Sequence, residues 1–212
     1  MSRLIETLQP GMRVFVPTLS TESSLLLDEL RADPDRARGV VFTGVQFPGI
    51  GPADYLALLP RARQAAFFMT RSVRAGLDDG RADLLSLDYL GIARHLRQAA
   101  PMDLAVAHLT LPDVDGWCSP GLSSDFMPLV WSQARRRVAH LNSRMPRTQG
   151  SFRVHISELD AAVEADAPLN EFIESPSGDV EAQIGRHVAA LIRNGDTLQF
   201  GIGSVPLALA GA

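Results

Sequence analysis

A glycine-rich turn near the end of the sequence has the residue types and spacing to bind an anion. Gly201 and Gly203 follow the apolar run 197–200 and precede Pro206, which suits the first turn of a helix. Backbone N–H groups at a strand–turn–helix junction can face a phosphate or a developing oxyanion. A plain tight turn explains the two glycines equally well, because glycine tolerates positive φ. A dinucleotide fingerprint is disfavoured, since Pro206 replaces its third glycine.

Cys118 and the acidic residues before it are weaker candidates. A thiolate nucleophile needs a base that a third group holds in place, and only His108, a few residues upstream, is near in sequence. His108, Asp113 and Asp115 are potential metal ligands, but the spacing provides no complete ligand set. The aspartates are better explained as turn caps, so we predict no metal site and no catalytic cysteine.

The segment 142–150 also carries polar groups on irregular backbone. It contains Asn142, Arg144, Met145 and Arg147, and its two guanidinium groups are able to grip a phosphate or a carboxylate. A solvated crossover between two elements accounts for the same composition.

Composition and charge exclude several classes of function. The 212 residues carry 24 acidic side chains against 20 cations, all of them arginine, for a net charge of −4. Schiff-base chemistry and a phosphate-binding loop with lysine are therefore excluded, and the charge argues against a nucleic-acid partner. One cysteine, no apolar run of membrane length and no signal-peptide core at the start predict a cytoplasmic protein.

Short apolar runs alternate with segments of helical period, which predicts an α/β fold with an open, mostly parallel sheet flanked by helices. The predicted strands are 12–16, 39–45, 64–69, 82–87, 102–109, 152–157 and 197–200. The predicted helices are 22–31, 90–98, 124–142 and 179–193, and a further helix starts near Pro206.

The last segment begins a new strand–turn–helix unit just before the sequence stops at Ala212. We therefore expect one α/β domain over 1–194 and the start of a second, truncated domain over 195–212. This arrangement predicts that the chain is the front part of a longer protein or docks onto a second chain.

Taken in order, several segments resemble the acetyl-CoA hydrolase/transferase family, which includes 4-hydroxybutyrate and acetate CoA-transferases. The matching segments are 8–14, 80–83, 115–119, 142–150, 152–157, 167–169, 184–188 and 195–206. The resemblance covers nearly the whole chain, and the order of the motifs is more specific than any one of them.

The resemblance implies an α/β/α fold like that of CoA-transferases and ribose-phosphate isomerases, of which this chain is the amino-terminal half. It also implies that a loop formed by Gly201, Ile202, Gly203, Ser204 and Val205 lines the coenzyme A site. Asn142, Met145 and Gln199 are expected close to the acyl end, with Arg144 and Arg147 as phosphate contacts. The family's nucleophile is a glutamate beyond Ala212, so no catalytic residue is expected within this sequence.

The expected activity is an acyl-CoA:carboxylate CoA-transferase or an acyl-CoA hydrolase, with acyl-CoA and a small carboxylic acid as substrates. A homo-oligomer and a carboxyl-terminal half or second chain are the expected partners. One alternative is an inactive CoA-binding or regulatory module, or one subunit of a split transferase. A weaker one is a sugar-phosphate isomerase or deaminase-like enzyme, for which the sequence offers no convincing acid–base pair.

Overall fold

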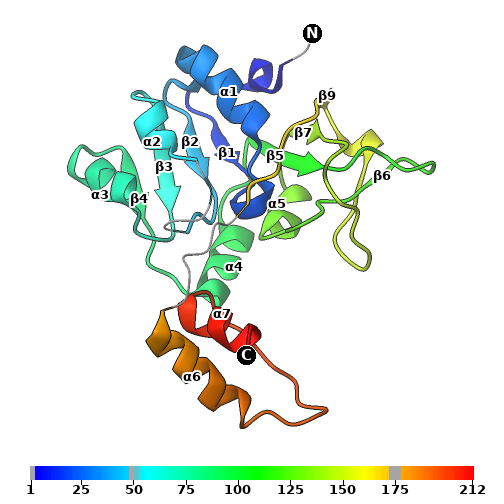
Figure 1. Ribbon diagram of the computed structural model, residues 1–212. Helices are drawn as coiled ribbons and strands as arrows, with labels where there is room; N and C mark the ends of the chain where they lie inside the picture. Colours follow the sequence, from blue (N-terminus) through cyan, green and yellow to red (C-terminus); the bar gives the residue numbers. More distant parts are fainter. Residues whose placement is uncertain (1–2, 48–50, 52, 172–177) are drawn as a thin grey trace. The chain divides into compact units, whose positions relative to one another are not determined.

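The central feature of the fold is an open sheet of seven parallel strands (Figure 1). The computed structural model describes residues 3–47, 51, 53–171 and 178–212. The strands follow the order β4-β3-β2-β1-β5-β7-β9, and every neighbouring pair is parallel. They are β1 (Arg13–Phe15), β2 (Val41–Thr43), β3 (Arg63–Ala66), β4 (Ala82–Leu84), β5 (Leu104–Leu109), β7 (Arg137–Leu141) and β9 (Ala161–Glu164). The predicted parallel α/β architecture is confirmed.

Helices cover both faces of the sheet. They are η1 (Leu4–Thr7), η2 (Leu19–Thr21), α1 (Ser24–Ala32), η3 (Pro34–Ala37), α2 (Tyr55–Leu58), α3 (Arg71–Asp78), α4 (Tyr89–Gln98), α5 (Met127–Trp131) and η4 (Ile156–Glu158). Leu104 and Val106 of β5 pack in the cluster that contains α1, whereas Ala105 and Ala107 pack in the cluster that contains α4 and α5. Because successive strand residues point to opposite faces, a strand buried on both sides reads as a continuous apolar run.

Local sequence explains where the main helices start. Ser23, Asp54, Thr70 and Asp88 precede α1, α2, α3 and α4, and each side chain accepts a hydrogen bond from the backbone N–H three residues later. These bonds satisfy N–H groups that have no partner within the helix. The helices predicted at 22–31 and 90–98 are confirmed with small shifts at their ends.

The predicted long helix 124–142 is wrong. The segment forms α5 over five residues and then β7, the strand next to β5. Val138 and Leu141 fit a helical stripe by spacing, but β7 is buried along almost its whole length. A strand buried on both faces does not alternate between apolar and polar residues, so periodicity does not separate it from a helix.

Two predicted strands do not belong to the large sheet. The segment 152–157 forms β8 (Val154–His155) and the start of η4, and β8 pairs antiparallel with β6 (Trp117–Cys118) in a separate two-stranded sheet. Residues 197–200 are exposed and form no strand, since no strand of the described residues pairs with them. The edge strand β9 was missed because it has only four residues, none of them fully buried.

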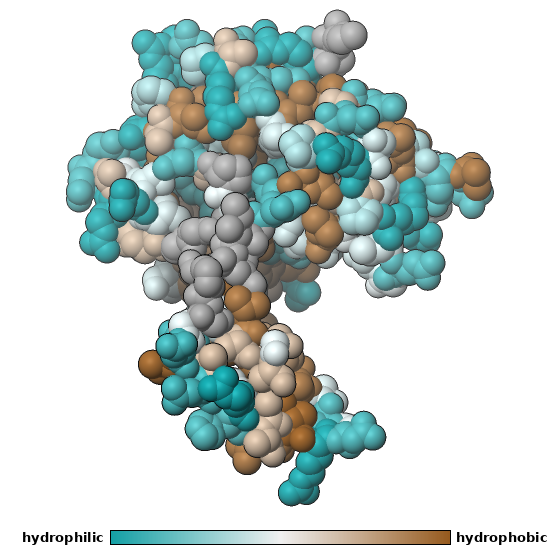
Figure 2. Space-filling view, viewed as in Figure 1, coloured by the Kyte–Doolittle hydropathy of each residue, from teal (hydrophilic) through white to brown (hydrophobic). Residues whose placement is uncertain are grey.

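The chain divides into two compact units, Met1–Glu171 and Phe172–Ala212. The described part of the second unit contains α6 (Asp179–Ala189) and α7 (Ser204–Ala210), so the predicted helices there are confirmed. The domain boundary after residue 194 stays a prediction. Figure 2 shows apolar residues gathered over the second unit, where Val180, Leu191 and Ile202 are among the most exposed apolar side chains.

No helix within the described residues combines the length and the hydrophobicity that crossing a bilayer requires.

Candidate functional site

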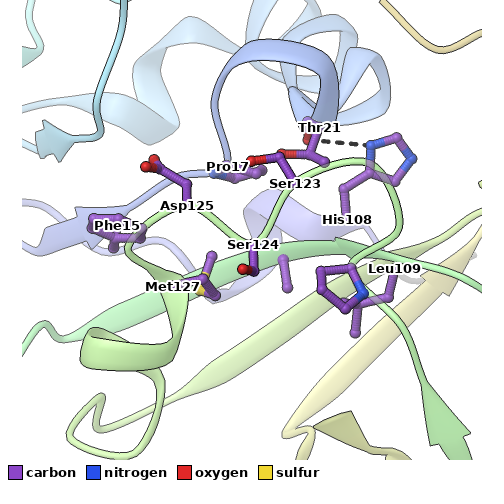
Figure 3. A pocket seen from close by; sticks show the side chains of 11 residues that line it. Phe15, Pro17, Thr21, His108, Leu109, Ser123, Ser124, Asp125 and Met127 are labelled. Carbon is purple, nitrogen blue, oxygen red and sulfur yellow. Dashed lines mark hydrogen bonds between the residues drawn. The ribbon is translucent and has the colours of Figure 1, made fainter. Parts of the chain in front are cut away.

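A small cavity lies in the first unit where the order of the strands reverses. From β1 the chain first builds the sheet outward through β2, β3 and β4, and then returns to place β5 on the other side of β1. In open α/β sheets, ligands bind at the carboxyl ends of strands at such a switch point. The cavity is lined by Phe15, Pro17, Thr21, Ala107, His108, Leu109, Pro120, Ser123, Ser124, Asp125 and Met127 (Figure 3). Its volume is about 20 Å³, enough for one water molecule or one small group.

Asp125 is held in the wall of this cavity by a strained backbone. It has φ of 42°, and Leu19, which follows Thr18, has φ of 58°; within the described residues these are the two non-glycine residues with positive φ. The Thr18 hydroxyl donates a 3.0 Å hydrogen bond to the Asp125 carboxylate. Burial raises the pKa of Asp125 to about 6, although the bonds from Thr18 and the Phe126 N–H oppose the shift. Strain of this kind concentrates at functional sites.

Two buried imidazoles stack behind the cavity. His108 and His140 are paired in register on β5 and β7, with ring centroids 4.2 Å apart and planes 4° from parallel. Their partners assign both tautomers. The carbonyl oxygens of Thr21 and Ala165 only accept, so His108 Nδ1 and His140 Nε2 each donate, at 3.3 Å and 2.7 Å.

The remaining ring nitrogens therefore accept, and both rings are neutral. His108 Nε2 accepts from the Asn142 amide at 3.0 Å, and His140 Nδ1 accepts from the Ser23 hydroxyl at 3.0 Å. Burial, with the neighbouring His140 ring adding to it, lowers the pKa of His108 to about 4. Burial also lowers the pKa of His140. The pair is thus suited to holding neighbouring backbone in place and not to carrying a positive charge.

Asn142 and Met145 lie just past β7 in the same unit. The Asn142 side chain donates to Ala167 O at 2.9 Å and accepts from the N–H groups of Arg144 and Ala167, and the residue is fully buried. Met145 is buried as well, and its sulfur lies against Gly121. Both residues therefore brace the loop after β7, and their predicted proximity to a substrate stays a prediction.

Glu22 is a buried ionisable residue that sequence analysis did not single out. It is 2% exposed, accepts a 3.1 Å hydrogen bond from the Ala53 N–H, and is 3.4 Å from the Asn170 amide nitrogen. Burial raises its pKa to about 7, against the opposing effect of the Ala53 bond. Tyr55, also buried, has its pKa raised by burial and by the nearby Glu22 carboxylate.

The turn around Cys118 is structural. Asp113 accepts from the N–H groups of Asp115 and Trp117, which confirms its role as a turn cap. Cys118 is buried, and burial raises the pKa of its thiol, which disfavours the thiolate a nucleophile needs. The Arg147 guanidinium donates to the carbonyls of Leu111 and Trp117 at 2.7 Å and 3.0 Å, so it fastens this turn to the loop after β7. No cluster of three or more potential metal ligands occurs within the described residues.

The predicted CoA loop lies in the second unit. Gly201, Ile202 and Gly203 precede α7, and Ser204 and Val205 are its first residues. Gly203 has φ of 143° and ψ of 172°, a conformation essentially restricted to glycine. Gln199 is exposed two residues before the loop. The predicted site residues therefore fall into two groups, one in each unit.

Comparisons with known proteins place these residues in context. A model of the acetyl-CoA hydrolase/transferase N-terminal domain matches residues 1–174. The 4-hydroxybutyrate coenzyme A transferase of Clostridium kluyveri is 36% identical over 182 residues, or 85% of this chain. The succinyl-CoA:acetate/propanoyl-CoA:succinate CoA transferase of Fasciola hepatica is 33% identical over 158 residues, or 74% of this chain.

The fold is shared with a solved structure. RipA from Yersinia pestis superposes with a TM-score of 0.83 at 24% identity over 98% of this chain. The chain spans only part of each of these proteins: 42% of the Clostridium kluyveri protein, 33% of the Fasciola hepatica protein and 51% of RipA.

Proposed function

The chain belongs to the acetyl-CoA hydrolase/transferase family, and on that premise we propose that it forms the amino-terminal part of an acyl-CoA:carboxylate CoA-transferase. The observation that carries the proposal is the family match over residues 1–174, because that range contains every residue that lines the switch-point cavity. Acyl-CoA and a small carboxylic acid are the substrates. The cytoplasmic location and the homo-oligomeric state stay predictions.

The proposed reaction needs a nucleophilic carboxylate. This carboxylate attacks the acyl thioester and releases the CoA thiolate, leaving a mixed anhydride. The thiolate then attacks the anhydride at the enzyme's carbonyl, which frees the donor acid and leaves an enzyme-bound CoA thioester. The acceptor acid takes the CoA through the same two steps in reverse. By resemblance to the family, the carboxylate is a glutamate beyond Ala212.

Each step also needs donors aimed at a carbonyl oxygen that becomes negative. A donor of this kind contributes on the order of 3 kcal/mol to transition-state stabilisation. The loop Gly201 to Val205 is our candidate for coenzyme A binding, and its glycine-restricted backbone at Gly203 supports close approach of a ligand to the main chain. Asn142, Met145 and Gln199 remain proposed neighbours of the acyl end.

The proposal is tested with the natural full-length polypeptide. Incubation with acetyl-CoA and butyrate should form butyryl-CoA and acetate. Borohydride or hydroxylamine trapping, followed by peptide mass analysis, should place the covalent adduct on a glutamate carboxyl-terminal to residue 212. The control is the same protein with that glutamate changed to alanine.

Other outcomes separate the alternatives. Release of free CoA from acetyl-CoA at the same rate with or without an acceptor acid would identify a hydrolase. Calorimetric binding of CoA without any turnover or adduct would identify an inactive binding module and reject the transferase proposal.

A further inference from the structure

The segment that follows β1 is a short turn with a strained backbone. Residues 18–23, called the η2 turn here, connect β1 through η2 to α1. Leu19 in this turn has φ of 58°, a left-handed conformation that residues other than glycine adopt rarely. Such a conformation is costly and persists only when surrounding contacts hold it. The η2 turn therefore depends on groups outside it.

Four side chains from distant parts of the first unit bond to the η2 turn. They are the Asp125 carboxylate, the Asn170 amide, the His108 ring and the His140 ring, which bond to Thr18, Leu19, Thr21 and Ser23 at 3.0 Å, 3.3 Å, 3.3 Å and 3.0 Å, respectively. Figure 3 shows the bond between Thr21 and His108 at the wall of the switch-point cavity. Contacts that are far apart in the sequence thus hold a conformation that the turn would not adopt alone.

Glu22 is the one ionisable side chain within the turn itself, and it is almost completely enclosed. The residue is 2% exposed. Its carboxyl accepts a 3.1 Å hydrogen bond from the Ala53 N–H and lies 3.4 Å from the Asn170 amide nitrogen. An added Cβ at Gly51 would lie 2.8 Å from one of its oxygens, so the carboxyl packs directly against main chain.

No positive charge compensates Glu22. Its partners Ala53 N–H and Asn170 are neutral donors, and Tyr55 of α2 is a neutral phenol whose pKa is raised by burial and by Glu22. No arginine among the described residues forms an ion pair with Glu22, and the sequence contains no lysine. Burial raises the pKa of Glu22 to about 7. An ionised carboxylate without a counter-charge is costly in this position and inexpensive in water.

We propose that the η2 turn is a proton-controlled switch, in which Glu22 keeps the turn closed as a neutral acid and opens it as a carboxylate. On ionisation the proton passes to solvent, and the carboxylate gains full hydration only when it leaves the Ala53 and Asn170 donors. Opening also relieves the strain at Leu19. Because the pKa of enclosed Glu22 lies above its unfolded value of 4.5, its contribution to closure is complete below pH 4.5 and is lost as pH rises through 7.

Opening of the η2 turn would change the switch-point cavity. Pro17, directly before the turn, and Thr21 within it both line the cavity. Movement of these two residues would remove part of the wall and enlarge a space that measures about 20 Å³ when the turn is closed. The inference concerns the first unit alone and does not depend on the proposed function.

Other titratable groups that contact the turn also respond to pH. Burial raises the pKa of Asp125 to about 6, so Asp125 acts in the same sense as Glu22. His108 and His140 act in the opposite sense, because burial lowers their pKa values and favours closure as pH rises. The effect of Glu22 is therefore isolated by comparing a variant with wild type at each pH, where the other groups are the same in both proteins.

The test is hydrogen exchange of the natural full-length polypeptide at pH 5 and pH 7.5, with each rate divided by the intrinsic chemical rate at that pH. Glu22→Gln keeps an oxygen that accepts from Ala53 but is unable to ionise. In peptides covering 16–27, the ratio of wild-type rate to variant rate should be about tenfold or more larger at pH 7.5 than at pH 5. Glu164→Gln, an exposed change of the same kind, should leave that ratio unaltered.

Peptides from β5 separate local opening from global unfolding. This strand is buried at every position, so its amides should exchange only when the whole first unit unfolds. The η2 turn should exchange faster than β5 in wild type at both pH values.

A second variant tests the hold on the turn without changing Glu22. Thr18→Val keeps the shape of the side chain but removes the hydroxyl that donates to Asp125. Exchange in 16–27 should become about three- to tenfold faster at pH 5, as expected for one lost hydrogen bond. Thr197→Val, exposed in the second unit, is the matched control.

Three results would overturn the switch. One is a ratio of wild-type to Glu22→Gln rates that is equal at the two pH values. Another is exchange of the η2 turn no faster than that of β5, which would mean that the turn opens only in global unfolding. The third is an unchanged rate in Thr18→Val, because a turn that needs no outside contact stores no strain to release.

Discussion

At the scale of single side chains, the first unit contains several buried ionisable residues whose pKa values are shifted by burial. Burial raises the pKa of Glu22 to about 7 and that of Asp125 to about 6, while it lowers the pKa of His108 to about 4. In all four groups, including His140, burial shifts the pKa toward the neutral form. The buried carboxyls make the protein less stable as pH rises, whereas the buried imidazoles make it less stable as pH falls.

Glu22→Gln should reveal the carboxyl contribution. Because the pKa of folded Glu22 lies above its unfolded value of 4.5, its contribution is fully present below pH 4.5 and is lost as pH rises through 7. The amide has no charge to bury, yet its oxygen is able to accept from Ala53. The variant should therefore gain on the order of 2–3 kcal/mol relative to wild type at pH 8 compared with pH 4.5.

Urea unfolding of both proteins at the two pH values measures the change, with exposed Glu164→Gln as the control. The histidine pair works the other way, since stability held by a lowered histidine pKa is lost as pH falls from 6.5 toward 4. With Glu22 replaced, stability should rise more steeply between pH 5 and pH 7. An equal difference between variant and wild type at both pH values would contradict the assignment.

A residue's role could be predicted from the sequence only when its hydrogen-bond partners lie close to it along the chain. Asp113 caps N–H groups two and four residues ahead, so its role was predictable. Asp125 meets Thr18 across 107 residues, and Glu22 meets Asn170 across 148. Only the fold brings such pairs together, so the cavity and its carboxylate were missed.

At the scale of elements, prediction succeeded where a short apolar run is bounded by turn residues or where a helix begins at a capping side chain. The strands β1 to β5 and the capped helices α1 and α4 were predicted. It failed at β7, whose arginine-flanked apolar residues fit either period, and at β9, whose four residues are only partly buried. The choice for these two strands depends on the neighbouring strand and not on local propensity.

Gly185→Ala should loosen the contact between α6 and α7. Alanine normally stabilises a helix interior relative to glycine by about 1 kcal/mol. Here an added Cβ would lie 2.8 Å from the backbone carbon of Ala208 and 3.0 Å from the nitrogen of Leu209, neither of which is a flexible side-chain end. Hydrogen exchange in peptides from 179–212 should therefore become about tenfold faster or more, as expected for a loss above 1 kcal/mol.

Gly211→Ala provides the matched control in the same unit. Its φ is −91°, and the nearest atoms to an added Cβ are 3.8 Å and 3.9 Å away, which is ordinary contact. Exchange in that variant should match wild type. Slower exchange in Gly185→Ala would mean that helix propensity outweighs the close approach of α7.

At the scale of the whole molecule, the two units differ in how much core they contain. Among the residues that the structure describes, the buried apolar clusters all lie in the first unit, whereas Gly185 is the one buried residue in α6 and none is buried in α7. The stability of the sheet should therefore come from residues 1–171. The family resemblance found in the sequence extends over both units. It rests on the order of several motifs along the chain, which stays recognisable where the local pattern fits either a helix or a strand.

Two truncations test where the first unit ends. A chain of residues 1–171 keeps β9 and the three clusters, so its sheet should unfold at nearly the same urea concentration as the full chain.

A chain of residues 1–159 loses β9 and leaves β7 as an unpaired edge. It also removes Ala165 O and Ala167, the partners of buried His140 and Asn142. Because unpaired buried polar groups cost about 1–3 kcal/mol each, the shorter chain should be unfolded or aggregate, as followed by circular dichroism and gel filtration. Equal unfolding midpoints for the two truncated chains would show that β9 and its following segment do not hold the imidazole pair in place.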